Sequence, residues 1–234
     1  MIRDMENILL EISADTSKVI GTEDILGAVV LSLLISGLSI PISIAIGFPI
    51  GSLVALRNFR GKGTVITTIN SLMGIPPILV GLLVYLLLSR SGPLGLLNLL
   101  FTPEAMIIAQ VIIVTPIIIG LTQSSVSGVD RRIRDLALSL GASQNQLILT
   151  SLKEARTGII AAVVAGFGRA ISEVGAVLMV GGGIRFLTRN ITVGIFLSVE
   201  LGDFVLALTL GFILLIISFI VNLFFTKLQG GVLR

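Results

Sequence analysis

The 234-residue chain contains no cysteine and no histidine. Without these residues it has no disulfides, no thiol nucleophile, none of the usual ligands of zinc or haem, and no histidine to act as a general base. Charged residues are also scarce, at 12% of the sequence, whereas soluble domains carry about a quarter. We therefore expect neither a self-contained enzyme nor a resident metal.

A motif for nucleotide phosphates is missing as well. The pattern G-x-x-x-x-G-K-[ST] cradles phosphates with backbone amides. The segment GKGT at 61–64 has Leu56 at the place of the upstream glycine. Any ATP chemistry would have to be supplied by a partner, so we expect no cofactor on this chain.

Hydrophobic residues make up 54% of the sequence, and the mean hydropathy is +1.09. A spanning helix needs about 20 mostly apolar residues, and backbone groups in lipid must pair within their own segment. These rules predict an all-α, multi-pass membrane protein with five transmembrane helices, at about 25–56, 63–89, 105–128, 157–184 and 204–226. The first range is longer than a bilayer requires and contains Pro41 and Pro49, which predicts a kink or a helix that continues beyond the membrane.

Loop charges predict the orientation. Basic residues prevail in the first connection, in the long connection 129–156 and near the C-terminus, whereas acidic residues prevail before the first span. By the positive-inside rule the N-terminus is outside and the C-terminus inside, which an odd number of crossings also requires. We thus expect an external segment 1–23 without a cleaved signal peptide, a membrane domain 24–228 and a cytoplasmic tail 229–234. Residues 5–20 fit either a helix on the outer surface or a frayed tail.

The cytoplasmic connection is unusually polar and reads VDRRIRDLALSLGASQNQLILTSLKEARTG over 129–158. A helical stretch around 135–140, a break at Gly141 and Ala142, and a second helical run predict a helix-turn-helix elbow. Ala137 would allow close approach of a partner, Gly141 would supply a left-handed residue, and Asp135 would lie near the positive end of its helix. Both a docking knob and an ordinary amphipathic connector fit this pattern.

The elbow and its surroundings resemble a known family. RDLALSLGAS is similar to the EAA loop of binding-protein-dependent ABC importer permeases, although Leu136 and Lys153 depart from the usual residues. The run KEARTGIIAAVVAGFGRAISEVGAVLMVGGGIRFLTRNIT resembles the tungstate branch of the molybdate, sulfate and tungstate permeases. SLMGIPPILVGLLVYLLLSRSGPLG resembles the second core helix of this family. The resemblance covers about residues 25–228.

The resemblance implies a type I ABC importer permease in the plasma membrane of a prokaryote. Two copies would form the pore, two ATPase subunits would hold ATP and Mg²⁺, and an extracytoplasmic binding protein would deliver an oxyanion; nucleic acid has no part. Tungstate is the expected substrate, with molybdate or sulfate as alternatives. A secondary transporter and a membrane scaffold are the other classes. The implied ATPase-coupling residues are Arg134, Asp135, Ala137, Leu140, Gly141 and Ala142.

Two charges interrupt the fourth predicted span. Arg169 would lie at mid-membrane, with Glu173 one helical turn further along. Ionisable residues inside a membrane are costly and are functional by default. They are predicted either to form a structural ion pair or to line the path of the anion.

A glycine-rich basic segment follows this span. Gly182 and Gly183 precede Arg185 and Arg189. Flexible backbone amides together with guanidinium groups suit a tetrahedral oxyanion or an acidic face of a binding protein. A plain loop with interfacial arginines is the alternative.

Overall fold

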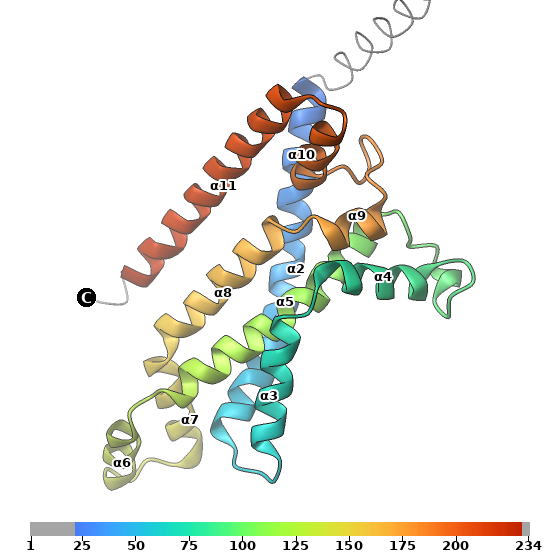
Figure 1. Ribbon diagram of the computed structural model, residues 1–234. Coiled ribbons are helices and arrows are strands. Elements are labelled where there is room, and N and C mark those ends of the chain that lie inside the picture. The colour runs from blue at the N-terminus through green and yellow to red at the C-terminus, as the bar shows by residue number, and fades with distance from the viewer. Residues whose placement is uncertain (1–21, 231–234) are drawn as a thin grey trace, which may run out of the picture.

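The computed structural model describes residues 22–230, and within them every regular element is helical. The surface helix considered for residues 5–20 and the end of the tail lie outside the described residues. The elements are α2 (Thr22–Leu56), α3 (Lys62–Met73), α4 (Pro77–Leu88), the short 3₁₀ helix η1 (Gly95–Leu97), α5 (Pro103–Ser127), α6 (Arg131–Ser139), α7 (Gln144–Glu154), α8 (Arg156–Ile171), α9 (Gly175–Gly181), α10 (Ile191–Glu200) and α11 (Phe204–Gly230) (Figure 1).

Three helices are long and apolar enough to cross a membrane on their own: α2, α5 and α11. α2 is a single helix of 35 residues with Pro41 and Pro49 inside it. At 1.5 Å per residue it is about 52 Å long, well beyond the hydrocarbon core of a bilayer.

The other two predicted spans are broken, which corrects the expectation of single helices. Range 63–89 consists of α3 and α4, which meet at 92°, and range 157–184 contains most of α8 and all of α9, which meet at 54°. The first break has a plain cause in the sequence, because consecutive prolines at 76 and 77 cannot donate backbone hydrogen bonds. Pro77 then occupies the first turn of α4, where a proline is tolerated. Up to five spans result if each bent pair crosses as one.

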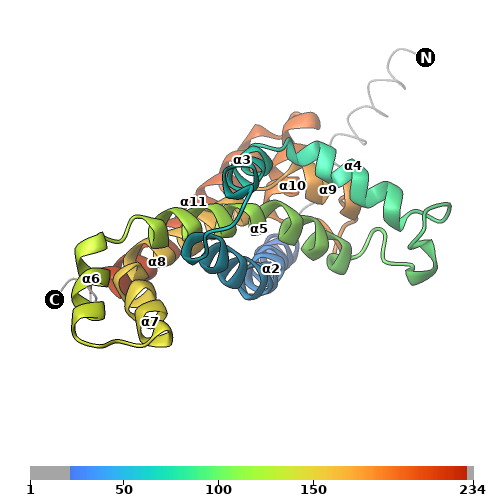
Figure 2. The same cartoon turned by 90° about the horizontal axis from the view of Figure 1, so that it is seen from below.

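α5 lies at the centre of the bundle, between α2, α3 and α8 (Figure 2). α2 packs tightly against it because Gly47 and Gly51 face α5. A Cβ atom at Gly51 would lie 2.6 Å from the carbonyl oxygen of Ile119, closer than packed atoms allow. Small residues four apart thus bring two backbones together, as in many membrane helix pairs.

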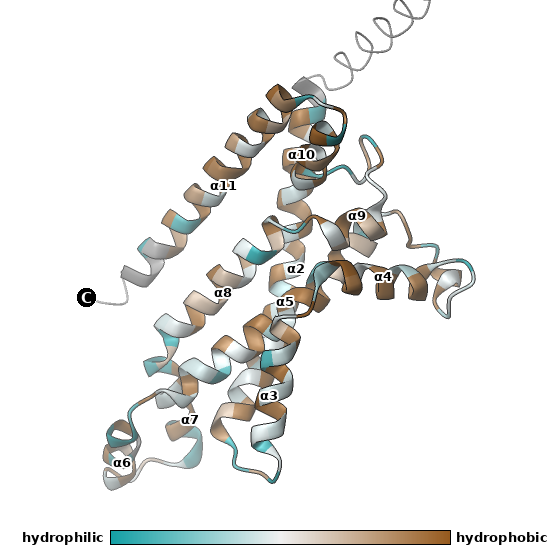
Figure 3. Cartoon of the chain, in the orientation of Figure 1, coloured by the Kyte–Doolittle hydropathy of each residue, from teal (hydrophilic) through white to brown (hydrophobic). Residues whose placement is uncertain are grey.

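α11 lies at the periphery, with most of its large apolar side chains exposed. α4 is likewise apolar and projects from the bundle on the other side (Figure 3). The hydrophilic exception is α6, which lies with α7 at the end of the molecule remote from the tip of α4 (Figures 1 and 3). α10 was not predicted. It is only 10 residues long, and the side chain of Asn190 caps it by accepting from the backbone N–H of Val193.

Candidate functional site

The two charges of the fourth predicted span lie at the break between α8 and α9, with Arg169 in the last turn of α8. α8 ends at Ile171, so Glu173 lies in the break rather than one turn further along a continuous helix, which corrects the expectation from sequence. Nη1 of Arg169 nevertheless lies 2.8 Å from Oε2 of Glu173. The Glu173 side chain is 3% exposed and that of Arg169 is 32% exposed. The carboxylate is therefore buried, whereas the guanidinium lies partly at the surface.

Glu173 also organises the helices that follow. Its Oε1 accepts a hydrogen bond of 3.0 Å from the backbone N–H of Ala176, in the first turn of α9. A carboxylate at this end of a helix satisfies an orphan N–H and opposes the positive dipole. The carbonyl of Glu173 accepts from the hydroxyl of Thr192 in α10 at 2.7 Å. One residue thus joins the end of α8 to the starts of α9 and α10.

A buried glutamine extends this network to the two central helices. Gln110 of α5 donates through Nε2 to the carbonyl oxygen of Ala170 at 2.9 Å. Its Oε1 accepts from the hydroxyl of Ser39 in α2 at 2.9 Å. Gln110 and Ser39 are both buried. We call Ser39, Gln110, Arg169, Glu173 and Thr192 the polar hub.

The hub brings five helices to one point in an otherwise apolar bundle. A side chain that donates to a carbonyl beside a helix break helps to fix the position of that break. Any movement of α8 relative to α9 must strain or exchange these bonds. The hub is therefore suited to hold α8 and α9 in the observed arrangement. Sequence analysis identified Arg169 and Glu173 but missed Gln110 and Ser39, because an amide and a hydroxyl in apolar helices give no distinctive signal.

The predicted elbow is formed by α6 and α7 (Figure 2). Gly141 has a φ of 79°, in the left-handed region. The N–H of Gly141 donates to the carbonyl of Leu138 at 2.9 Å, and the N–H of Ala142 donates to that of Ala137 at 3.0 Å. This bond pair is the Schellman motif, which ends a helix with a sharp change of direction. Ser143 then starts α7 with a capping box completed by Gln146.

The start of α6 differs from the prediction. Asp130 caps the helix by accepting from the N–H of Arg132 at 2.9 Å. Asp135 is consequently in the middle of α6 rather than near its positive end. Its side chain is exposed, as are Leu136 and Leu140. Arg134 lies in the same helix, and its side chain is outside the described part.

Exposed leucines give the elbow an apolar face, which fits both a docking knob and an amphipathic connector. Leu136 is 62% exposed and Leu140 is 80% exposed. Four residues apart, they lie on the same face of α6, at the end nearest the Schellman turn. The base of the elbow is anchored by Leu147 and Ser151 of α7, which are buried. An apolar tip on a rigid, anchored support is typical of a docking surface.

The basic segment after α9 is ordered by internal contacts. Gly182 and Gly183 both have positive φ values, of 72° and 63°. Arg189 donates from Nε to the carbonyl of Gly183 at 3.1 Å. Thr188, which the sequence did not single out, donates to the carbonyl of Gly181 at 2.5 Å.

Arg185 is engaged by an acid far away in the sequence. Its Nε and Nη2 lie 3.0 Å and 2.7 Å from the two carboxylate oxygens of Asp24 at the start of α2. These hydrogen bonds raise the pKa of Arg185 above its ordinary value. The guanidinium also stacks on Phe186, 4.8 Å from its ring centroid. Arg185 therefore ties the loop to α2.

The structure thus separates the predicted residues into three groups: the elbow, the hub and the basic segment. Among residues 22–230 no cluster of three or more Asp or Glu side chains could hold a metal ion.

Comparison with known proteins gives consistent results. The profile of the family described as "Binding-protein-dependent transport system inner membrane component" matches residues 47–234. A "Probable anion ABC transporter permease protein" from Haloferax volcanii is 43% identical over 197 residues, covering 82% of this chain and 85% of that protein. The "Tungstate uptake system permease protein TupB" of Peptoclostridium acidaminophilum is 42% identical over 199 residues, covering 85% and 87%.

The fold has a counterpart among solved structures. A chain from an inward-facing structure of the MetNI methionine ABC transporter superposes with a TM-score of 0.77. The alignment covers 91% of this chain and 98% of that chain, at 16% sequence identity. At this identity the likeness concerns the arrangement of helices.

Proposed function

Since the chain belongs to the family of binding-protein-dependent transport system inner membrane components, we propose that it forms the pore of an ATP-driven oxyanion importer. Two copies would line the pore, two ATPase subunits would bind ATP and Mg²⁺ beneath them, and an extracytoplasmic binding protein would supply the anion. In this arrangement the N-terminus is outside and the elbow is cytoplasmic. The bundle is then a multi-pass component of a prokaryotic plasma membrane.

The observation that carries the coupling role is the apolar tip of the elbow. Leu136 and Leu140 are exposed on a helix whose end is fixed by two Schellman hydrogen bonds. An exposed apolar face with a rigid backbone binds a groove with little loss of conformational entropy. We assign α6 as the helix that each ATPase subunit contacts, with Asp135 and Ala137 at the edge of that contact.

The substrate assignment follows from similarity. The relative from Peptoclostridium acidaminophilum that is 42% identical is named for tungstate uptake. Tungstate, molybdate and sulfate are all tetrahedral dianions, so backbone amides and guanidinium groups would recognise each of them. We propose tungstate as the substrate, with molybdate or sulfate as the alternative.

The polar hub supplies the mechanical element. ATP-driven closure of the ATPase subunits would draw the elbows together, and α7 and α8 would transmit this movement to the break at Ser172–Val174. The ion pair of Arg169 and Glu173 holds that break in one arrangement. Because Arg169 is partly exposed, its free guanidinium nitrogens would face a passing anion if that side lines the pore.

The test is ATP hydrolysis by the complete complex in liposomes, with the binding protein loaded in turn with tungstate, molybdate or sulfate. The strongest stimulation is expected with tungstate. If molybdate or sulfate gives the strongest stimulation, that anion replaces tungstate as the assigned substrate, and the assignment as an importer stands. A complex whose ATPase ignores the loaded binding protein would refute the importer itself.

A matched pair of variants tests the elbow. Gly141→Val and Gly61→Val each place a β-branched side chain at a left-handed residue, with φ of 79° and 86°, and a Cβ at either glycine meets nothing within 4 Å. Both changes add the same kind of backbone strain. Only Gly141→Val is expected to abolish co-purification of the ATPase. Equal loss of co-purification in both variants would contradict the coupling role of the elbow.

A further inference from the structure

A pocket of about 650 Å³ opens where α4 ends, away from the hub and the elbow. Its walls come from the end of α4 and from the connection to α5, which includes η1. The connection is anchored to α9 by a hydrogen bond of 2.9 Å from the N–H of Phe101 to the carbonyl of Val180. Asn98 and Phe101 have positive φ values of 49° and 65°. These contacts give the pocket a defined shape.

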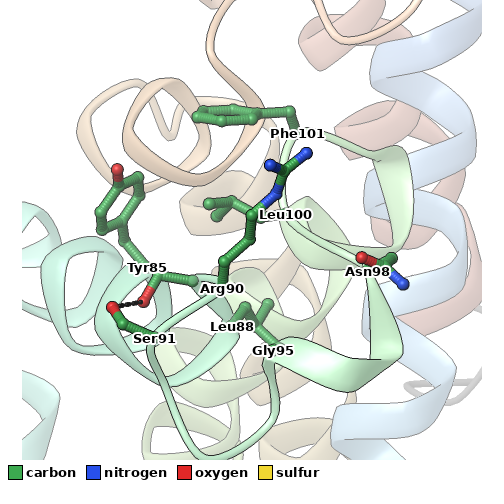
Figure 4. A pocket seen from close by; sticks show the side chains of 9 residues that line it. Tyr85, Leu88, Arg90, Ser91, Gly95, Asn98, Leu100 and Phe101 are labelled. Carbon is green, nitrogen blue, oxygen red and sulfur yellow. Dashed lines mark hydrogen bonds between the residues drawn. The ribbon is translucent and has the colours of Figure 1, made fainter.

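The pocket contains one cation and several donors. Arg90 is exposed and forms no ion pair with any residue in the range 22–230. In Figure 4 its guanidinium and the hydroxyl of Tyr85 point toward the same side of the pocket. The hydroxyl of Ser91 lies on the wall, 3.4 Å from that of Ser89. A guanidinium and a tyrosine hydroxyl that face the same side of a pocket (Figure 4) can both donate to phosphate-type oxygens.

Exposed apolar side chains lie on the same connection as this cation. Three leucines of the connection, Leu94, Leu96 and Leu97, are exposed, Leu96 to 94%. Tyr85 and Phe101 form an edge-to-face pair with centroids 6.2 Å apart. If α3 and α4 cross as one bent span, the connection between α4 and α5 lies at a membrane surface, where exposed leucines contact lipid and tyrosine is favoured.

We propose that this pocket binds the headgroup of an anionic phospholipid, with the phosphate at Arg90 and the acyl chains along the exposed leucines. The volume favours this ligand over a free tetrahedral anion, because pockets of several hundred cubic ångströms suit organic molecules. A cation without an ion pair in the range 22–230, hydroxyl donors and exposed leucines on the same connection together match an amphiphile with a negative head. This inference is independent of the transport function.

The experiment uses the full chain, delipidated in a neutral detergent and supplied with phosphatidylglycerol, phosphatidylcholine or sodium tungstate. Native mass spectrometry counts bound lipid, and thermal unfolding reports stabilisation. Wild type is expected to retain phosphatidylglycerol about tenfold better than phosphatidylcholine, the size of one charge-assisted contact. Arg90→Gln should abolish the preference, Arg90→Lys should keep most of it, and Tyr85→Phe should weaken it.

The control is Arg60→Gln, which removes an exposed cation from the connection between α2 and α3. It should leave the lipid preference unchanged. An equal loss in Arg60→Gln and Arg90→Gln would show non-specific charge attraction and refute the site. Stabilisation by tungstate rather than by lipid, lost in Arg90→Gln, would assign the pocket to a free oxyanion and overturn the proposal. A dimer that dissociates in Arg90→Gln while lipid binding persists would assign the pocket to contacts between copies, with the same consequence.

Discussion

Removing Arg169 alone should harm the protein more than removing it together with the charge of Glu173. The Glu173 side chain is 3% exposed and has the guanidinium of Arg169 at 2.8 Å as its counter-charge. Breaking a buried pair by removal of one partner costs about 3–5 kcal/mol, because the remaining charge is left uncompensated. Since Arg169 is itself about a third exposed, we expect the lower end, about 3 kcal/mol, for Arg169→Met.

The double variant Arg169→Met/Glu173→Gln should lose far less. Glutamine keeps an oxygen that accepts the hydrogen bond from the N–H of Ala176, so the start of α9 stays capped. No buried charge remains, and replacing a whole buried ion pair is often neutral. We expect a loss of about 1 kcal/mol or less, so that adding Glu173→Gln to Arg169→Met recovers about 2 kcal/mol.

The assay is thermal unfolding of the purified chain in detergent, with reversible denaturant titration to obtain the free energy of unfolding. For a chain of this size, about 3 kcal/mol corresponds to a fall in Tm of about 6–12 °C. The double variant should regain most of that fall. Equal destabilisation of the single and double variants would mean that Glu173 finds another counter-charge or protonates, and would refute the role of the pair as a lock.

Three further predictions concern other parts of the bundle. Gly51→Ala should destabilise the protein by about 1–3 kcal/mol, because α2 and α5 must separate. The control Gly37→Ala should be neutral or stabilising, because its Cβ would meet nothing within 4 Å. Equal free energies of unfolding for the two variants would contradict the close packing of α2 on α5. Gln110→Leu should cost about 1–3 kcal/mol in the same titration, because its two buried hydrogen bonds, to the carbonyl of Ala170 and from the hydroxyl of Ser39, are both lost. An unchanged stability would remove Gln110 from the hub. Arg185→Gln should speed amide hydrogen exchange in the loop after α9 while leaving α5 unchanged, and slow exchange in that loop would show that the contact with Asp24 is dispensable.

How far the sequence predicts the fold depends on the kind of break. The bend between α3 and α4 could have been read from Pro76 and Pro77, because two consecutive residues without an N–H cannot continue a helix. The bend between α8 and α9 has no proline. Its cause is tertiary, since the carbonyl of Ala170 and the N–H of Ala176 find partners in Gln110 and Glu173. Periodicity and composition carry no trace of such partners.

The elbow was predictable because its chemistry is local. A left-handed residue at the end of a helix strongly favours glycine, so Gly141 marks the turn within the sequence itself. The start of α6 was misplaced because Asp130 and Asp135 are both plausible helix-start residues. Only the hydrogen bond from the N–H of Arg132 identifies Asp130 as the cap. The roles of the elbow residues toward a partner stay predictions.

The ion pair of Arg169 and Glu173 was expected on a continuous helix, but it forms across a helix end. A spacing of four predicts contact on a continuous helix, yet α8 ends between the two residues and the contact forms across its end. The difference is physical. On a continuous helix the pair would only neutralise two charges, and exchanging both for apolar residues would leave the backbone intact. At a break, Glu173 also accepts a hydrogen bond from the backbone of α9.

The variant Arg169→Met/Glu173→Leu should therefore be less stable than Arg169→Met/Glu173→Gln. The expected difference is that of a lost helix cap, about 1 kcal/mol. Equal stability of these two double variants would mean that the cap on α9 contributes nothing, and the hub would reduce to a charge pair.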